Sequence, residues 1–361
     1  MDMQEKLKMH KEEVDKRLSS YMWEKVKHAV DMYKNEYISG MTEIIRDYNL
    51  RGGKRIRPAY VIEGYKAVGG TDTDEIYNAS LAAEILEGYL LVHDDIMDKD
   101  DLRRGGPTVH RIYREYYQKN ISADLANATH FGNSMAIIIG DILETMAIDA
   151  IASTKFDPVR KAKAIKRYSQ VVRYTGYGQA LDMLLENMPV EKVKKEDILM
   201  VHKLKTSIYT MEGPLHIGGI LGGASEEQLK SYTDYAIPLG QAFQIHDDLL
   251  GMFGDEKKLG KPATSDLKEG KRTFLIIKAL ENGTEDQKQK IKQRLGNPNV
   301  TMEEVEEIRD IIKTTGSFEY SKNLANELAE EARIAIRNAD ITTEGKEYMI
   351  GIADYMVNRE Y

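Results

Sequence analysis

Two short stretches of the sequence place a cluster of carboxylates directly after an apolar run. The first, LLVHDDIMD, carries Asp94, Asp95 and Asp98, and the second, FQIHDDLLG, carries Asp247 and Asp248. Clustered carboxylates repel one another unless cations hold them. Hard oxygen ligands of this kind suit magnesium, which keeps open coordination positions for water and substrate phosphate. Both stretches are therefore candidate magnesium sites.

Helical spacing separates the roles of the first three aspartates. Residues four apart share one face of a helix, so Asp94 and Asp98 are predicted to point together while Asp95 is turned aside. One such cluster alone is compatible with a solvated helix end that has no function. Its repetition in a similar context, with a basic segment after each copy, favours metal binding.

Basic residues beside glycines form the second pattern. Phosphate groups are bound by cationic side chains and by backbone N–H groups. Each basic segment alone is compatible with a solvated surface loop, but their alternation with acidic clusters and apolar helices indicates a metal-bridged diphosphate on an apolar molecule. The cations are Lys54, Arg55 and Arg57 in GGKRIRP, Arg103 and Arg104 in LRRGG, Lys205 in HKLKT, Lys261 in GKP, and Lys271 and Arg272 in EGKR.

The elements that must position these residues are helices. Apolar residues recur at three- and four-residue spacing, which predicts helices over residues 7–30, 75–93, 122–153, 158–186, 196–221 and 226–250, and shorter ones after residue 272. Ser225 and Thr301 are predicted helix N-caps because acidic residues follow them. No stretch alternates Val, Ile and Thr long enough to require a sheet. The prediction is one all-α domain over residues 1–361.

Composition narrows the class of protein. The 361 residues are 42% hydrophobic and 30% charged, as in an ordinary soluble globular protein. A net charge of −8 argues against general nucleic-acid binding, and the absence of Cys excludes disulfides and thiolate chemistry. The sequence shows neither a secretory signal nor an apolar run long enough for membrane insertion. We expect a cytoplasmic protein that handles an apolar molecule.

The blocks resemble, in type and order, those of the trans-isoprenyl diphosphate synthases, which include farnesyl and geranylgeranyl diphosphate synthases. The matching blocks are GGKRIRP, LVHDDIMDKDDLRRGGPTVH, KT and AFQIHDDLLGMFGDEKKLGKPATSDLKEGKRT, with GQALD as a weaker one. They run from residue 52 to 273, and the archaeal-type geranylgeranyl synthases are the most similar. The resemblance implies an isoprenoid-synthase-type helical bundle around a central apolar cavity, and a homodimer.

Roles follow from this resemblance residue by residue. Magnesium, about three ions per active site with manganese as a substitute, would be ligated by Asp94, Asp98 and Asp247 and supported by Asp95, Asp248 and Asp266. Isopentenyl diphosphate would be held by Lys54, Arg57 and Arg104, and the allylic diphosphate by Arg103, Lys205 and Lys261, with Lys271 nearby. Thr206 and Gln244 would direct their dipoles at the developing allylic cation.

The implied reaction joins isopentenyl diphosphate to dimethylallyl, geranyl or farnesyl diphosphate after magnesium-assisted ionisation. Product length depends on what closes the apolar cavity. Tyr89 lies five residues before Asp94, about 7.5 Å of helix rise, and Leu86 lies nearly one turn deeper. A single aromatic floor of this kind favours geranylgeranyl diphosphate with some farnesyl diphosphate, although an aromatic on an apolar helix is more often simply core.

Two positions depart from the family pattern. Glu87 stands where many members carry a His or Gln that helps to bind isopentenyl diphosphate. A carboxylate there would repel a diphosphate unless it is protonated, paired with Lys54 or Arg57, or turned away. Gly251 stands where many members carry a third Asp. We expect activity to survive this difference, and a restored aspartate to change little.

Three other functions compete with this interpretation. A class I terpene cyclase shares the first aspartate motif but needs a second motif, N-D-x-x-S-x-x-x-E, which the chain lacks. A non-catalytic regulatory subunit of a heteromeric prenyl synthase typically loses one aspartate-rich region, whereas Asp247 and Asp248 are present here. A longer-chain polyprenyl diphosphate synthase differs only in the depth of its cavity.

Overall fold

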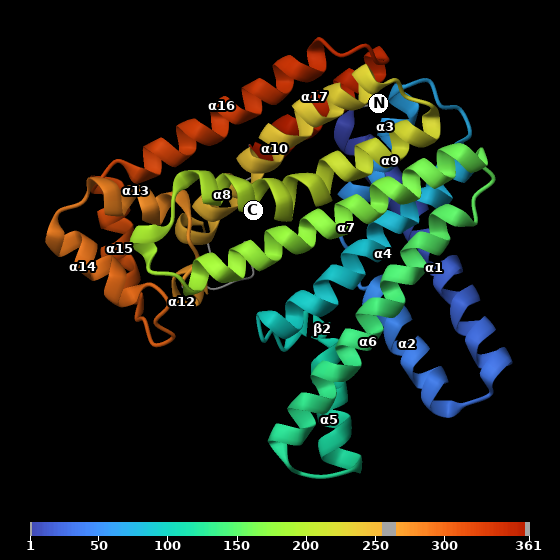
Figure 1. The fold of residues 1–361 in the computed structure, drawn as a ribbon, viewed down its shortest axis with the longest axis horizontal. Coiled ribbons are helices and arrows are strands. Elements are labelled where there is room, and N and C mark those ends of the chain that lie inside the picture. Colours follow the sequence, from blue (N-terminus) through green and yellow to red (C-terminus); the bar gives the residue numbers. More distant parts are fainter. Residues whose placement is uncertain (1, 255–264, 358–361) are drawn as a thin grey trace. The chain divides into compact units, whose positions relative to one another are not determined.

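A computed structural model describes residues 2–254 and 265–357 (Figure 1). Over these ranges the chain is helical almost throughout, which confirms the all-α prediction. Its two strands, of two residues each, form a single hairpin. The chain divides into two compact units. Unit 1 comprises Met1–Tyr168 and Pro214–Ala224, and unit 2 comprises Ser169–Gly213 and Ser225–Tyr361.

Unit 1 is built from long helices and the hairpin. Its helices are α1 (Met3–Tyr33), α2 (Glu36–Leu50), α3 (Ile56–Ala67), α4 (Thr73–Met97), α5 (Val109–Asn120) and α6 (Leu125–Ala152), the first part of α7 (Pro158–Asn187), and α9 (Gly213–Gly222) from its second residue onward. Strands β1 (Leu102–Arg103) and β2 (Gly106–Pro107) pair antiparallel between α4 and α5. The α5 and α6 helices lie side by side (Figure 1).

Helix α4, which carries the first aspartate cluster, is the central element of unit 1. Asp72 caps its start by accepting a hydrogen bond from the Glu75 N–H at 3.2 Å. The helix is buried on most sides and contacts α1, α2, α3, α5 and α6. Gly140 lets α6 approach closely, since a Cβ there would fall 2.1 Å from Nε2 of His93. The neighbours therefore hold the end of α4 in place.

Unit 2 packs its helices around a separate apolar core. After the end of α7 its elements are η1 (Val190–Lys192), α8 (Lys195–Val201), η2 (His202–Glu212), α10 (Glu226–Phe253), α12 (Ser265–Glu269), α13 (Phe274–Asn282), α14 (Glu285–Arg294), α15 (Met302–Thr314), α16 (Ser317–Arg337) and α17 (Thr343–Val357). Helices α10 and α16 lie side by side (Figure 1). Ile245, Phe274 and Ile308 belong to this core.

The predicted helices are present, with one difference in winding. Ser225 and Thr301 each form a capping box, with Gln228 and Glu304 as partners. The predicted helix over residues 196–221 is interrupted by η2, which winds as a wider π-helix. Periodicity does not reveal this change, because the apolar spacing on either side is that of an ordinary α-helix. Within residues 2–254 and 265–357 no helix has the length and apolar character to cross a bilayer.

Candidate active site

Asp94 and Asp98 lie one turn apart at the C-terminal end of α4. Asp98 is the C-cap, and its backbone N–H donates to the Asp94 carbonyl at 2.8 Å. Asp94 is half-buried and Asp98 is exposed. The helix therefore places both carboxylates on one face, as their spacing predicts.

Asp95 is directed away from that face and is fully buried. Its carboxylate accepts hydrogen bonds from the Tyr48 hydroxyl and from Nε of Arg103, both at 2.7 Å. Arg103 also donates to Asp100 at 2.8 Å. Asp95 thus anchors Arg103 next to the end of α4 that carries Asp94 and Asp98. Sequence reasoning missed Tyr48, because nothing in the spacing links α2 to this aspartate.

Glu87 lies between two arginines that the resemblance assigns to isopentenyl diphosphate. Its Oε1 is 2.9 Å from Nη1 of Arg57 and 2.9 Å from Nη2 of Arg104. Burial raises the pKa of Glu87, but the two guanidinium groups outweigh it, and the pKa is lowered overall. Of the arrangements considered for this carboxylate, the structure shows pairing with Arg57. Lys54, the third predicted cation, is exposed.

The backbone conformation of the turn explains the two glycines that precede these cations. Gly52 and Gly53 adopt φ values of +84° and +149°, which side chains disfavour. A Cβ on Gly53 would fall 3.3 Å from Nη2 of Arg104 and 3.3 Å from Nη1 of Arg55. The turn therefore brings backbone against two guanidinium groups. That GGKRIRP binds an anion stays a prediction.

In unit 2 the η2 segment carries Lys205 and Thr206. Nζ of Lys205 donates to Asp182 of α7 at 2.7 Å, and the Thr206 hydroxyl donates to Oε1 of Gln244 at 3.0 Å. Gly178 allows α7 to approach η2 closely, since a Cβ there would fall 2.5 Å from the backbone nitrogen of Lys205. The weak GQALD match thus supplies both the small residue and the carboxylate that hold Lys205.

In the second aspartate pair, as in the first cluster, one carboxylate is buried beside a cation and its neighbour is more exposed. Asp248 is 2% exposed and accepts from Nζ of Lys271 at 2.8 Å, whereas Asp247 is half-buried. Burial would lower the pKa of Lys271, but Asp248 and Asp266 raise it above the ordinary value, so the ammonium stays charged. Burial and Lys271 lower the pKa of the neighbouring His202 to about 3, which keeps it neutral.

Gly251 has a neighbour that the sequence did not indicate. A Cβ at this position would fall 2.5 Å from Oδ2 of Asp266. A side chain there would require the Asp266 carboxylate, the end of a flexible side chain, to move aside. The expectation that a restored aspartate changes little stays a prediction. Lys261, predicted to bind the allylic diphosphate, lies outside the described residues.

The donors fit magnesium. Among the described residues no group of three or more His, Asp or Glu side chains is preassembled for a metal. Magnesium ordinarily binds through one or two carboxylates and completes its shell with water and substrate phosphate. Asp94 with Asp98 on one helix face, and Asp247 on α10, are donor sets of that kind.

The proposed chain-length residues sit on α4 in unit 1. The Tyr89 ring is half-buried and meets the His93 ring edge-on at 5.0 Å. Burial, with Glu144 and Asp141 of α6, raises the pKa of Tyr89, so its hydroxyl stays protonated. Leu86 is 3% exposed. Tyr89 is therefore partly accessible while Leu86 lies in the core, and their roles in chain length stay predictions.

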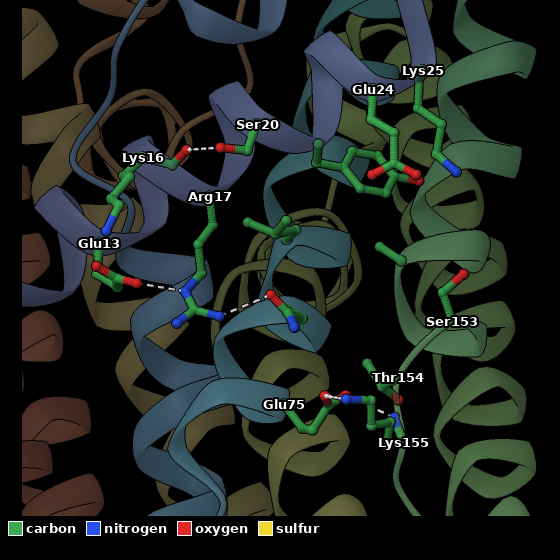
Figure 2. A pocket seen from close by; sticks show the side chains of 14 residues that line it. Glu13, Lys16, Arg17, Ser20, Glu24, Lys25, Glu75, Ser153, Thr154 and Lys155 are labelled. Atoms are coloured by element: carbon green, nitrogen blue, oxygen red, sulfur yellow. Dashed lines mark hydrogen bonds and ion pairs between the residues drawn. The ribbon is translucent and has the colours of Figure 1, made fainter. Parts of the chain in front are cut away.

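A separate polar cavity of about 480 Å³ opens in unit 1 (Figure 2). It is lined by residues of α1, of the first half of α4, and of the end of α6 and the segment just after it, including Arg17, Glu75 and Lys155. Arg17 is engaged by Glu13 and by Asn78. None of the predicted and described site residues lines this cavity.

An all-α protein with aspartates at helix ends and anchored cations beside them has the features of the isoprenoid-synthase class. The family comparison makes this specific, because the profile of the polyprenyl synthetase family matches residues 40–312. The chain belongs to that family.

Related proteins are similar to this chain over most of its length. Geranylgeranyl diphosphate synthase of Saccharolobus solfataricus is 35% identical over 311 residues, which is 85% of this chain and 87% of the relative. Short chain isoprenyl diphosphate synthase of Methanocaldococcus jannaschii is 38% identical over 271 residues, 75% of each chain. The crystal structure of a Corynebacterium glutamicum geranylgeranyl pyrophosphate synthase, complexed with isoprenyl diphosphate and magnesium, superimposes with a TM-score of 0.87 at 29% identity, covering 99% of this chain and 100% of that one.

Proposed function

We propose that the protein condenses isopentenyl diphosphate with allylic diphosphates and releases mainly geranylgeranyl diphosphate, with some farnesyl diphosphate. The observation that carries the proposal is the convergence of Arg57 and Arg104 on Glu87. Two guanidinium groups from separate segments there meet on one flank of the helix that ends in Asp94 and Asp98. Paired guanidinium groups suit bidentate phosphate binding.

Isopentenyl diphosphate is bound by Lys54, Arg57 and Arg104. The arginines are already oriented by their pairing with Glu87, so little side-chain entropy is lost when a diphosphate replaces that carboxylate. The exposed Lys54 adds a third cation from the same turn. Binding of the diphosphate must weaken the ion pairs of Glu87 with Arg57 and Arg104.

By the family resemblance, the allylic diphosphate would be held by Arg103, Lys205 and Lys261, with Lys271 nearby. Three of these cations have an anchoring carboxylate: Arg103 on Asp95, Lys205 on Asp182 and Lys271 on Asp248. A cation held in place before the reaction stabilises developing charge without reorganisation. Asp95 and Asp248 therefore support cations and do not themselves face the metal.

Asp94, Asp98 and Asp247 would hold magnesium. Magnesium, when bound, neutralises the diphosphate that departs as the carbon–oxygen bond of the allylic substrate breaks. Thr206 and Gln244, joined at 3.0 Å, direct oxygen dipoles at the allylic cation. The alkene of isopentenyl diphosphate then attacks, and its proton passes to the departed diphosphate. The apolar residues of α4 exclude water from the cation.

The preference for geranylgeranyl diphosphate is supported by Tyr89, the one aromatic between residues 80 and 93, and by the geranylgeranyl synthase among the relatives. In this proposal the half-buried Tyr89 ring limits the growing chain, and the buried Leu86 is the next side chain that the product would meet. A longer product would require the side chains of both Tyr89 and Leu86 to move out of the path of the growing chain.

We also propose that the chain works as a single domain and as a homodimer. Each compact unit is built from separate stretches of sequence, so neither is a continuous segment that could act alone. Exposed apolar side chains on α5 and α6 support a self-association face; they are Tyr116, Leu125, Ile137 and Ile138. The cytoplasmic location expected from the sequence stays a prediction.

The test is to incubate the purified chain alone with magnesium, isopentenyl diphosphate and each allylic diphosphate, and to separate the products by chain length. Geranylgeranyl diphosphate as the main product would support the proposal. A chain that is inactive alone but active after addition of a second prenyl synthase subunit would identify a regulatory subunit. Predominantly longer products would identify a longer-chain synthase.

A further inference from the structure

Unit 1 contains a buried ion-pair network next to the proposed isopentenyl diphosphate site. The Arg55 side chain is 1% exposed. Its Nε donates to Oδ1 of Asp15 on α1 at 2.7 Å, and its Nη1 contacts Oε1 of Glu84 on α4. Arg55 adopts a left-handed backbone conformation, φ +55°, which is uncommon for a residue with a side chain. The network links α1, the GGKRIRP turn and α4.

Glu84 is the acid at the centre of this network. It is 2% exposed and lies beside the guanidinium group of Arg55 and, with Nη1 at 3.7 Å, that of Arg104. The Glu87 side chain is also its hydrogen-bonding neighbour. Burial, with the charge of Glu87, raises the pKa of Glu84 to about 7, although Arg55 and Arg104 oppose the rise. A buried carboxylate of this kind needs a cation whenever it is ionised.

Arg104 therefore has two carboxylates within reach. It lies 2.9 Å from Glu87, where it stands beside Arg57, and 3.7 Å from Glu84. A Cβ on Gly53 would lie 3.3 Å from guanidinium nitrogens of both Arg55 and Arg104, so the β1–β2 hairpin brings Arg104 to the turn that carries Arg55. The position of Arg104 depends on which cation Glu84 engages.

We propose that Arg55 is a positioning residue for isopentenyl diphosphate: by engaging Glu84, it leaves Arg104 beside Arg57, where one diphosphate can bind both guanidinium groups. Asp15 orients Arg55 from α1. The inference rests on the proposed function, and it gives a role to the one arginine of GGKRIRP that the resemblance leaves without one.

Loss of Arg55 has a predictable consequence. Ionised Glu84 would then draw on Arg104, the other guanidinium group within ion-pair distance, and would compete with the diphosphate for it. Protonated Glu84 would not compete, so the defect must grow as pH rises through the titration of Glu84. The other charged groups that face the network are Lys11 and Asp15 of α1, Arg57 of α3 and Glu87 of α4.

The decisive variant is Arg55→Gln. The KM for isopentenyl diphosphate should rise ~10-fold at about pH 9 and less than ~2-fold at about pH 6.5, because only ionised Glu84 withdraws Arg104. The kcat and the KM for the allylic substrate should stay within ~2-fold. Adding Glu84→Gln to Arg55→Gln should restore the KM, since the competing carboxylate is gone.

Arg17→Gln is the matched control. Arg17 also joins α1 to α4, through Asp74 and Asn78, and its side chain lines the separate cavity (Figure 2). Asp74 precedes Glu84 by about 15 Å of helix rise, so this variant loses an interhelical arginine without touching the diphosphate site. Its KM for isopentenyl diphosphate should not depend on pH differently from that of the wild type.

Asp15→Asn tests the same network if Arg55→Gln does not fold. Asp15 is partly exposed, so the change should be tolerated and should raise the KM ~3-fold in the same pH direction. An unchanged KM in folded variants, or no recovery in the double variant, would overturn the role of Arg55. A wild-type chain that neither binds isopentenyl diphosphate by calorimetry nor turns it over would contradict the proposed function itself.

Discussion

Oε1 of Glu87 lies 2.9 Å from Nη1 of Arg57, so a carboxylate holds the guanidinium group that is assigned to a substrate diphosphate. A diphosphate must compete with this ion pair and with the matching one to Arg104. Glu87→Gln removes the charge but keeps a hydrogen-bonding side chain of the same length. We expect the KM for isopentenyl diphosphate to fall ~3-fold with the allylic KM unchanged.

Steady-state kinetics at saturating allylic substrate measure this change. Glu87→Ala serves as a comparison, because it frees the arginines without holding them in place. A ~10-fold rise in the KM of Glu87→Gln would show that the carboxylate itself helps to bind the substrate.

Asp94→Ala and Asp98→Ala should each lower kcat by ~100-fold or more, because both carboxylates share the helix face proposed to hold magnesium. Titration with magnesium should show a raised metal requirement in the same variants. Asp74→Ala is the control on the same helix, at its exposed N-terminal end. Near-normal kcat in either α4 variant would contradict the metal assignment.

Asp182→Asn should weaken binding of the allylic diphosphate, because Asp182 holds Nζ of Lys205 at 2.7 Å. Without the Asp182 carboxylate, the Lys205 side chain is mobile before binding and loses conformational entropy when the diphosphate binds. We therefore expect the allylic KM to rise ~5-fold and the KM for isopentenyl diphosphate to stay constant. Lys205→Ala should abolish the effect of the Asp182 change in a double-mutant cycle. Independent effects of the two changes would separate Asp182 from Lys205.

Gly251→Asp should reduce stability modestly while changing activity little. Its Cβ would fall 2.5 Å from Oδ2 of Asp266, and the added charge would repel that carboxylate. We expect the free energy of unfolding to decrease by ~1–3 kcal/mol in chemical denaturation, with Gly251→Ala showing the steric part alone. A more active Gly251→Asp variant would show that Asp266 can move aside and that a third carboxylate is useful.

Tyr89→Ala should lengthen the product, because it removes a half-buried ring from α4. Further truncation at Leu86 should extend the chains again, at a cost in stability of ~2–4 kcal/mol for a buried leucine. Product distributions from labelled isopentenyl diphosphate report the shift. A folded, active Tyr89→Ala variant with unchanged products would remove Tyr89 as the floor of the cavity.

The sequence predicted the helical elements and the local geometry of the aspartates. Apolar spacing located α1, α4, α6, α7 and α10, since burial of one helix face produces that periodicity. Four-residue spacing placed Asp94 and Asp98 on one face, and Ser225 and Thr301 capped helices as expected. These features depend on residues close together in the chain, where covalent geometry leaves few alternatives.

The partners of the charged groups were decided by tertiary structure. Tyr48 meets Asp95 across 47 positions, and Arg55 meets Asp15 and Glu84 across 40 and 29. Sequence reasoning left three alternatives for Glu87, because the cost of a buried carboxylate depends on which cations other helices bring to it. The close approach of Asp266 to Gly251 is likewise a product of packing. The chain by itself determined which chemistry is available, through the types and spacing of its acids and bases. Only the folded protein decided which of those charges are paired, because pairing requires segments distant in sequence to meet.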